Sequence, residues 1–199
     1  GVLTRDLGKY LGLVDRTVVI TGGARGIGRA MADRFARVGS NVLILDINDE
    51  DGQQTVQQIS DRGGTAAYYH CDITDYTQFQ ETLQKIHKEG DGIYVMIHNA
   101  GIPQKPGTIE EIGKEDIDRI IAVNLIALIY GTKIVTPLML EKARGVQIYT
   151  ASTAATIGME QRAVYVATKH GIVGFIKSMG IDYASKNIRF ISLAPGRVN

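Results

Sequence analysis

Tyr165 and Lys169 lie four residues apart in a segment whose apolar residues recur with helical spacing. Residues four apart share one face of a helix. An unperturbed phenol titrates near ~10, too high for a base at neutral pH, and a neighbouring ammonium lowers that value by stabilising the phenolate. A tyrosine and a lysine at this spacing are also a common surface pair. Ser152, thirteen residues before Tyr165 and just past a strand-like run, either reaches the same cleft or is an ordinary loop serine.

A glycine-rich segment, TGGARGIG at Thr21–Gly28, directly follows one strand-like run and opens a helix-like one. Gly22 permits a tight turn, and Gly26 and Gly28 carry no side chain that would block close approach of a pyrophosphate or of the helix. The helix N-terminus offers unpaired N–H groups to phosphates. The segment predicts a dinucleotide-binding turn, with an ordinary strand-to-helix turn as the alternative. The cofactor-binding residues assigned to it are Gly22, Ala24, Arg25, Gly26, Ile27 and Gly28.

Asp46 ends the second strand-like run, 18 residues beyond Gly28. This is close to the ~20 residues expected before a carboxylate that hydrogen-bonds the adenosine ribose. A carboxylate there would repel a 2′-phosphate, and the next residue, Ile47, offers no positive charge to offset it. These residues favour NAD over NADP. Arg25 argues the other way, because a basic residue in the turn could meet that phosphate; alternatively it is solvated or lies over the adenine.

Short β-branched runs alternate with longer amphipathic segments along the whole chain. Runs such as TVVIT and NVLIL are apolar at nearly every position, as expected when helices cover both faces of a parallel sheet. The predicted strands are Thr17–Thr21, Asn41–Leu45, Ala66–Tyr69, Ile93–Ile97, Val146–Thr150 and Ile188–Leu193. The predicted helices are Ile27–Val38, Asp49–Asp61, Tyr76–Glu89, Lys114–Glu141 and Arg162–Ala184.

Composition narrows the class of protein. The 199 residues fit one domain at 14–199, preceded by a short N-terminal arm at 1–13. A formal net charge of +1 gives no general attraction to nucleic acid or anionic lipid. A single cysteine, Cys71, makes no internal disulfide, and we expect a cytoplasmic protein. The apolar stretch Ile120–Gly131 is shorter than the ~20 residues of a membrane span, so we expect a buried helix. His70 and Cys71 point to opposite faces of a strand, so we predict no metal site.

Together these residues resemble the classical short-chain dehydrogenases/reductases, from Val14 to the last residue. The resemblance implies that Tyr165 is the general acid/base on the substrate oxygen, that Ser152 hydrogen-bonds this oxygen, and that Lys169 tunes Tyr165 and binds the nicotinamide ribose. It also implies that Asn124 anchors a water linking Lys169 to solvent. The motifs that carry it are TGGARGIG, Asp72 in CDIT, HNAG at 98–101, Asn124 in AVNL, Ser152, YVATK at 165–169 and PG at 195–196.

The resemblance extends to the cofactor contacts. It implies that Asp72 bonds the adenine amino group, that the turn at 99–101 lies beside the adenosine ribose, and that the PG pair lies against the nicotinamide. The family commonly has two asparagines before the Ala-Gly pair, whereas His98 occupies the first position here; we expect a core or sheet-end histidine rather than a catalyst. Beyond the glycine turn, the predicted cofactor-binding residues are Asp46, Ile47, Asp72, Ile73, Asn99, Ala100, Gly101, Tyr165, Lys169, Pro195, Gly196 and Val198.

The implied activity is hydride transfer between NAD(H) and a secondary alcohol or ketone, such as a polyol or sugar. The alternatives are an NADP-dependent carbonyl or 3-oxoacyl reductase of the same family and a non-catalytic NAD-binding sensor, which need not keep Ser152, Tyr165 and Lys169. Epimerases of the extended branch typically show GxxGxxG, not the GxxxGxG found here. The helices 114–141 and 162–184 resemble those that pair across family dimers, so we expect a homodimer or homotetramer; burial under a C-terminal segment is the alternative.

The resemblance implies an α/β fold, a Rossmann-type doubly wound parallel sheet in a single domain. Family members usually continue beyond PGRVN with a hydroxyl residue for the carboxamide, a substrate lid, another helix and an edge strand. We expect the lid and the C-terminal edge strand to be missing because the sequence is a piece of a longer protein; a true end with an open site is the alternative. Ala154, Gly158 and Met159 are expected to line the substrate pocket, whose substrate the sequence does not identify.

Overall fold

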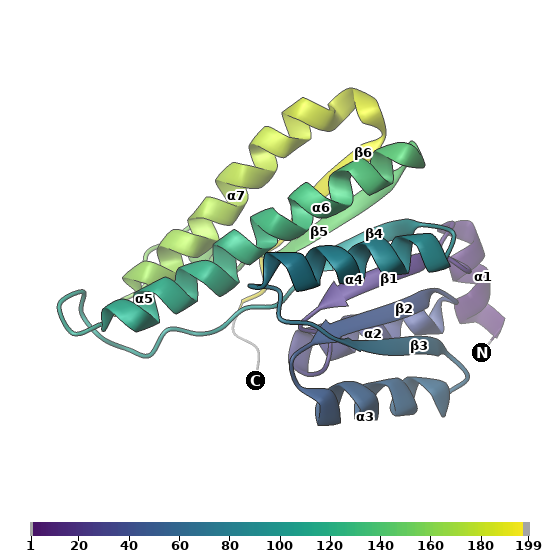
Figure 1. Cartoon of the computed structure of the whole chain (residues 1–199), viewed down its shortest axis with the longest axis horizontal. Helices are drawn as coiled ribbons and strands as arrows, with labels where there is room; N and C mark the ends of the chain where they lie inside the picture. Colours follow the sequence, from purple (N-terminus) through teal and green to yellow (C-terminus); the bar gives the residue numbers. More distant parts are fainter. Residues whose placement is uncertain (1, 197–199) are drawn as a thin grey trace.

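The computed structural model describes residues 2–196 and shows a six-stranded parallel sheet with helices on both faces (Figure 1). The sheet order is β3-β2-β1-β4-β5-β6, with every pair parallel, so the predicted doubly wound Rossmann-type fold is confirmed. The strands are β1 (Thr17–Thr21), β2 (Asn41–Asp46), β3 (Thr65–His70), β4 (Ile93–His98), β5 (Gly145–Thr150) and β6 (Ile188–Leu193). The helices are α1 (Val2–Tyr10), α2 (Gly26–Arg37), α3 (Asp49–Ser60), α4 (Tyr76–Glu89), α5 (Lys114–Ile121), α6 (Ala127–Glu141) and α7 (Ala163–Tyr183), with short turns η1 (Ala122–Ile126), η2 (Thr153–Ala155) and η3 (Ala184–Lys186).

Alternation of side chains along the strands builds a core on each face of the sheet. Val18 and Ile20 of β1 pack with α2 and α3, whereas Val19 between them packs with α4 and α6. A third cluster gathers around Tyr149 of β5, under α7. The uninterrupted burial of β1 explains why its sequence is apolar throughout.

The strand order reverses beside β1, which pairs with β2 on one side and β4 on the other. The connections after β1 and after β4 therefore run to opposite edges of the sheet, and a crevice forms between them at the carboxyl ends of the strands. Ligands of doubly wound folds bind at this point. The fold thus places the loops after β1, β2, β4 and β5 around one space.

The segment Lys114–Glu141, predicted as one regular helix, is a single 28-residue helical run with a π-helical turn, η1, in its middle. The wider turn follows from a backbone hydrogen bond in which Ala127 N–H donates to the carbonyl of Ala122, five residues earlier. This run is long and apolar enough to cross a membrane by length and composition, and half of its most apolar stretch is buried within the protein. Core helices of soluble proteins meet the same criterion.

The N-terminal segment, expected as an arm, forms the helix α1. A nine-residue helix is below the ~12 residues that an isolated helix needs, so tertiary contact must support it. Gly8 provides that contact: a Cβ there would lie 1.8 Å from the carbonyl oxygen of Val38, at the end of α2. Such a long-range approach leaves no periodic signal in the sequence.

Candidate active site

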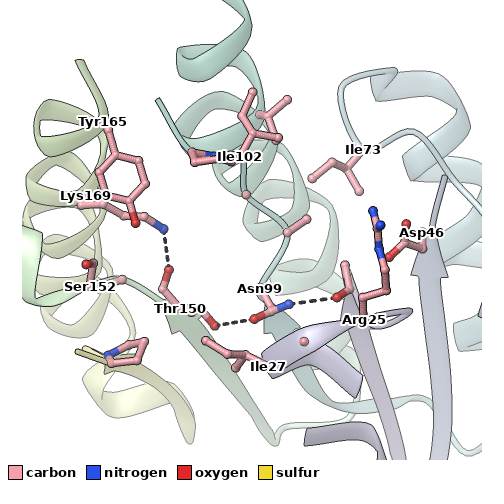
Figure 2. Close-up of a pocket in the computed structure, with 18 of the residues that line it drawn as sticks. Arg25, Ile27, Asp46, Ile73, Asn99, Ile102, Thr150, Ser152, Tyr165 and Lys169 are labelled. Atoms are coloured by element: carbon pink, nitrogen blue, oxygen red, sulfur yellow. Dashed lines mark hydrogen bonds between the residues drawn. The ribbon is translucent and has the colours of Figure 1, made fainter. Parts of the chain in front are cut away.

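A pocket of about 700 Å³ opens at the carboxyl ends of β1, β2, β4 and β5 (Figure 2). Ala24, Gly28 and Asn124 were predicted in the site but are buried and do not line this pocket. Val198 lies outside the described residues. The predicted residues that do line the pocket are Gly22, Arg25, Gly26, Ile27, Asp46, Ile47, Asp72, Ile73, Asn99, Ala100, Gly101, Ser152, Tyr165, Lys169, Pro195 and Gly196.

The glycine turn adopts a backbone that side chains would obstruct. Gly22 and Gly26 have φ values of 63° and 53°, in the left-handed region. A Cβ at Gly28 would lie 2.1 Å from the carbonyl oxygen of Gly22, whereas one at Gly26 would meet nothing within 4 Å. Arg25 is the N-cap of α2 and makes no side-chain capping bond. The first N–H groups of α2 are therefore not capped by that side chain and face open space at Gly26, an arrangement that suits a phosphate group.

Asp46 lies at the carboxyl end of β2 on the rim of the pocket. Its carboxylate accepts hydrogen bonds from the backbone N–H of Ala24 and of Asn48, both at 3.1 Å. The carboxylate is thus fixed against the glycine turn. Arg25 is 72% exposed at its side chain and pairs with Asp51 at 3.2 Å, which gives this arginine a protein partner beside the rim.

Asp72 and Ile73 form the rim on the other side of β2. The Asp72 carboxylate accepts from the backbone N–H and the hydroxyl of Thr74, at 2.9 and 2.7 Å. This short-range turn holds the exposed carboxylate at the end of the loop after β3. Its predicted contact with an adenine amino group remains a prediction.

A chain of hydrogen bonds joins the two ends of the pocket (Figure 2). The amide nitrogen of Asn99 donates to the carbonyls of Thr21 and Gly22, at 3.2 and 3.0 Å. The amide oxygen of Asn99 accepts from the Thr150 hydroxyl at 3.1 Å, and Lys169 Nζ donates to the Thr150 carbonyl at 2.9 Å. The glycine turn and the lysine are therefore held in one polar network through β4 and β5.

Tyr165, Lys169 and Ser152 lie at the same end of the pocket (Figure 2). Lys169 Nζ is 5.5 Å from the centroid of the Tyr165 ring. Burial lowers the pKa of Lys169 to about 8. Ser152 Oγ accepts from the backbone N–H of Ala154 at 3.1 Å, so its hydroxyl hydrogen is free to donate into the pocket. Together, the three groups can hydrogen-bond an oxygen atom of a ligand and exchange a proton with it.

Asn124 lies in the π-helical turn η1 and is 1% exposed. Its side chain makes a reciprocal pair with the backbone of Ile102, accepting from the N–H at 2.8 Å and donating to the carbonyl at 2.9 Å. A Cβ on Gly101 would lie 3.4 Å from Asn124 Oδ1 and 3.9 Å from Lys169 Nζ. Asn124 therefore fixes the loop after β4 close to the lysine. Its predicted role in holding a water stays a prediction.

His98 is a buried histidine at the end of β4. Its Nε2 lies 3.0 Å from Gln147 Oε1, and its ring stacks on Tyr149 with centroids 4.6 Å apart. Burial lowers its pKa to about 4, which the Gln147 hydrogen bond opposes. The ring does not line the pocket, in agreement with the core role expected for it.

The substrate end of the pocket differs in part from the expectation. Met159 lines it, but Gly158 is exposed outside the lining, and Ala154 is buried because the chain after Ser152 winds into the short turn η2. Thr150 could have been predicted from its place at the end of a strand, and Arg162 from lying one helical turn before Tyr165. The lining residues that the sequence did not reveal are Leu45, Cys71, Thr74, Ile102, Pro103, Gln104, Val123, Thr150, Ala151 and Arg162. Within residues 2–196, no three His, Cys, Asp or Glu side chains gather as metal ligands would.

Comparison with known proteins places this geometry in a family. A family model described as "short chain dehydrogenase" matches residues 16–199. An uncharacterized oxidoreductase of Bacillus subtilis (strain 168), YxbG, is 38% identical over 94% of this chain and 68% of its own length. A cyclopentanol dehydrogenase of Comamonas sp. (strain NCIMB 9872) is 33% identical over 92% and 72%. The structure of a NAD⁺-bound xylitol dehydrogenase superposes with a TM-score of 0.89 at 26% identity, over 92% and 71%. The chain belongs to the short-chain dehydrogenase family.

Proposed function

We propose that this protein is an NAD-dependent oxidoreductase that interconverts a secondary alcohol and a ketone. The observation that carries the proposal is that Tyr165, Lys169 and Ser152 share one end of a pocket whose other end is formed by the glycine turn and Asp46 (Figure 2). One end suits proton transfer at an oxygen and the other suits a dinucleotide. The named relatives support this class, since one oxidises cyclopentanol and one acts on xylitol according to their names.

The residues of the glycine turn fit the nicotinamide cofactor. The open space at Gly26, the first turn of α2 without a capping side chain, and the fixed Asp46 carboxylate match a pyrophosphate followed by a ribose. Gly22, Asn99 and Lys169 would hold the rest of the cofactor along the polar network. When bound, the nicotinamide supplies the hydride acceptor for alcohol oxidation or the hydride donor for ketone reduction.

The side chains at the other end handle the proton. In the oxidation direction, the phenolate oxygen of Tyr165 takes the proton of the substrate hydroxyl as the carbinol carbon gives up its hydride. Ser152 donates a hydrogen bond to the substrate oxygen and keeps it within reach of Tyr165. Lys169 places a positive charge beside the Tyr165 ring and so stabilises the phenolate form. In the reduction direction, Tyr165 returns the proton to the oxygen.

NAD is preferred over NADP in this proposal because the Asp46 carboxylate is fixed on the rim. The alternative, an NADP-dependent carbonyl or 3-oxoacyl reductase, is favoured by Arg25, whose exposed side chain lies beside Asp46 (Figure 2). The ion pair of Arg25 with Asp51 reduces the charge available to a 2′-phosphate. Competition between NAD and NADP at equal concentration distinguishes the two.

The test is steady-state absorbance of the reduced nicotinamide with NAD or NADP and a panel of secondary alcohols, including cyclopentanol, cyclohexanol and xylitol. Tyr165→Phe should lose about 10²- to 10⁴-fold in kcat while it still binds NAD. Tyr10→Phe, on a tyrosine that is 88% exposed on α1, is the matched control and should keep full activity. Equal turnover by native protein and Tyr165→Phe would show that the base is another residue.

A further inference from the structure

Arg162 brings a second positive charge to the end of the pocket where the substrate binds. It is the N-cap residue of α7 and lies three residues before Tyr165, and both residues line the same pocket. Arg162 lines the pocket and is only half-buried. The lining of the same pocket also contains the apolar residues Met159 and Pro103.

The guanidinium of Arg162 is held in place but has no acidic partner. Its Nη1 donates to the backbone carbonyl of Gln104, a residue that is itself 3% exposed. No carboxylate within residues 2–196 forms an ion pair with Arg162, including Glu160 two positions earlier. Because an arginine carries five N–H donors, the remaining donors of Arg162 stay available to a ligand.

The other described arginines differ from Arg162 either in having an acidic partner or in being exposed. Six of them pair with aspartates: Arg16, Arg25, Arg37, Arg62, Arg119 and Arg144. Arg29, Arg34 and Arg189 make no ion pair among the described residues, but all three are exposed, where water solvates the charge. Arg162 alone among these described arginines combines a place in a pocket, partial burial and no acidic partner. A partly desolvated guanidinium is stabilised when an anion binds to it.

We infer that Arg162 binds a carboxylate on the substrate, so that the preferred substrate is a hydroxy acid or the corresponding oxo acid. The inference rests on the proposed function, because it concerns the same pocket and the same hydride transfer. A carboxylate fits better than a phosphate: its single negative charge matches one arginine, and the planar guanidinium can bond both of its oxygens. Because Arg162 and Tyr165 lie three residues apart and both line the pocket, we expect the carboxylate to lie a few carbon–carbon bonds from the carbinol carbon.

The experiment compares hydroxy acids with their methyl esters, in a series with one, two or three bonds between the carbinol carbon and the carboxyl carbon. The native protein should prefer at least one acid over its ester by about 10- to 100-fold in kcat/KM, the range of a charged hydrogen bond. Arg162→Gln should bring this ratio close to one, and Arg162→Lys should keep part of the preference. Arg119→Gln, on an exposed arginine of α5, is the matched control and should leave the ratio unchanged.

A binding readout accompanies the kinetics. The saturated acids that lack the hydroxyl group are titrated into the protein with NAD, and the dissociation constant should rise about 10-fold or more in Arg162→Gln. If the native protein oxidises esters and acids equally well and Arg162→Gln binds the saturated acids as tightly, the inference is overturned while the proposed function stands. If Arg162→Gln loses acid and ester activity in equal proportion, Arg162 is a structural residue. If native protein oxidises other secondary alcohols but neither the acids nor the esters, the inference is overturned while the proposed function stands. If it oxidises no secondary alcohol at all, the proposed function fails, and the titration alone decides on Arg162.

Discussion

The side-chain oxygen of Gln104 accepts a hydrogen bond from the backbone N–H of Tyr165 at 2.9 Å, across 61 residues of sequence. The N-cap residue of α7, Arg162, makes no side-chain capping bond of its own. Gln104 therefore caps this helix from another loop, at the third position of its first turn. Its amide nitrogen also donates to the carbonyl of Gln161 at 3.3 Å. The loop after β4 thus fixes the start of the helix that carries the proposed base.

Replacing Gln104 by leucine should destabilise the protein and slow it. Leaving the part-buried N–H of Tyr165 without an acceptor should cost about 1–3 kcal/mol at most, and the first turn of α7 should loosen. We expect kcat to fall more than KM rises, because Tyr165 is misplaced while the rest of the pocket stays. Urea unfolding and steady-state kinetics measure both effects.

Gln104→Glu separates the loss of the helix cap from the other effects of replacing the side chain. A carboxylate still accepts a hydrogen bond from the Tyr165 N–H but cannot donate one to the Gln161 carbonyl. This variant should recover most of the stability lost in Gln104→Leu. Gln57→Leu, on an exposed glutamine of α3, is the control and should change neither quantity. If Gln104→Leu is as stable and active as native protein, the capping contact contributes to neither stability nor activity.

Asp46→Asn should raise the ratio of NADP to NAD activity by about 10-fold or more. The asparagine keeps one oxygen that can accept from the Ala24 or Asn48 N–H, so the glycine turn should persist, while the charge that repels a 2′-phosphate is gone. Asp46→Ala removes both acceptors and should also weaken the binding of either cofactor. Asp61→Asn, at the far end of α3, serves as the control. A cofactor ratio unchanged in Asp46→Asn would remove Asp46 from cofactor choice.

Lys169 should make the stability of the folded protein change with pH in the alkaline range. Burial lowers its pKa from 10.5 to about 8 in the folded state, so between pH 8 and 10.5 the unfolded chain binds more protons than the folded one. Stability contributed by this residue therefore increases with pH over that window. Relative to Lys169→Met, native protein should gain on the order of 3 kcal/mol in unfolding free energy as pH rises from 8 to 10.5.

Denaturant unfolding at a series of pH values measures this gain. Lys177→Met, on an exposed lysine of the same helix, controls for the loss of a charge. Its free energy of unfolding should change with pH in parallel with that of native protein. If the unfolding free energy of Lys169→Met also changes with pH in parallel with that of native protein, Lys169 titrates as an exposed lysine does.

The sequence predicted most of the fold because burial on both faces of the sheet leaves continuous apolar runs, as in β1 and β2. It also predicted most of the pocket, since motif residues such as Asp46 and Ser152 fall at the carboxyl ends of strands. Gln104 escaped prediction because its contacts with Arg162 and Tyr165 join segments about 60 residues apart and have no local pattern. The spacing of Arg162 before Tyr165 is a local signal, but the contact of Arg162 with Gln104 is not. The helix α1 and the π-turn at Asn124 escaped for the same reason: Gly8 against Val38 and Asn124 against Ile102 are tertiary contacts.

His98 and Gly131 should prove energetically coupled. Gly131 lies inside α6, where alanine would ordinarily be favoured by about 1 kcal/mol. A Cβ at Gly131 would lie 2.8 Å from His98 Cε1 and 3.0 Å from Phe79 Cε1, in the packed layer between β4 and α6. Because the histidine ring is fixed by Gln147 and Tyr149, it cannot move away at low cost. Gly131→Ala should therefore destabilise native protein by about 1–3 kcal/mol, the usual cost of overpacking.

In a His98→Asn background the shorter side chain removes the nearest of these contacts, so Gly131→Ala should cost less than in native protein. His98→Asn alone should lower stability, because it loses the stacking on Tyr149 and leaves space in the core. The double variant should then be more stable than the sum of the two single losses predicts, with a coupling energy of about 0.5–3 kcal/mol in a double-mutant cycle. Gly174→Ala, at a helical glycine where a Cβ would meet nothing within 4 Å, is the matched control and should be tolerated in both backgrounds. Additive losses for His98→Asn and Gly131→Ala would mean that α6 shifts to admit the methyl group. The His98 ring would then not be the reason for a glycine at position 131.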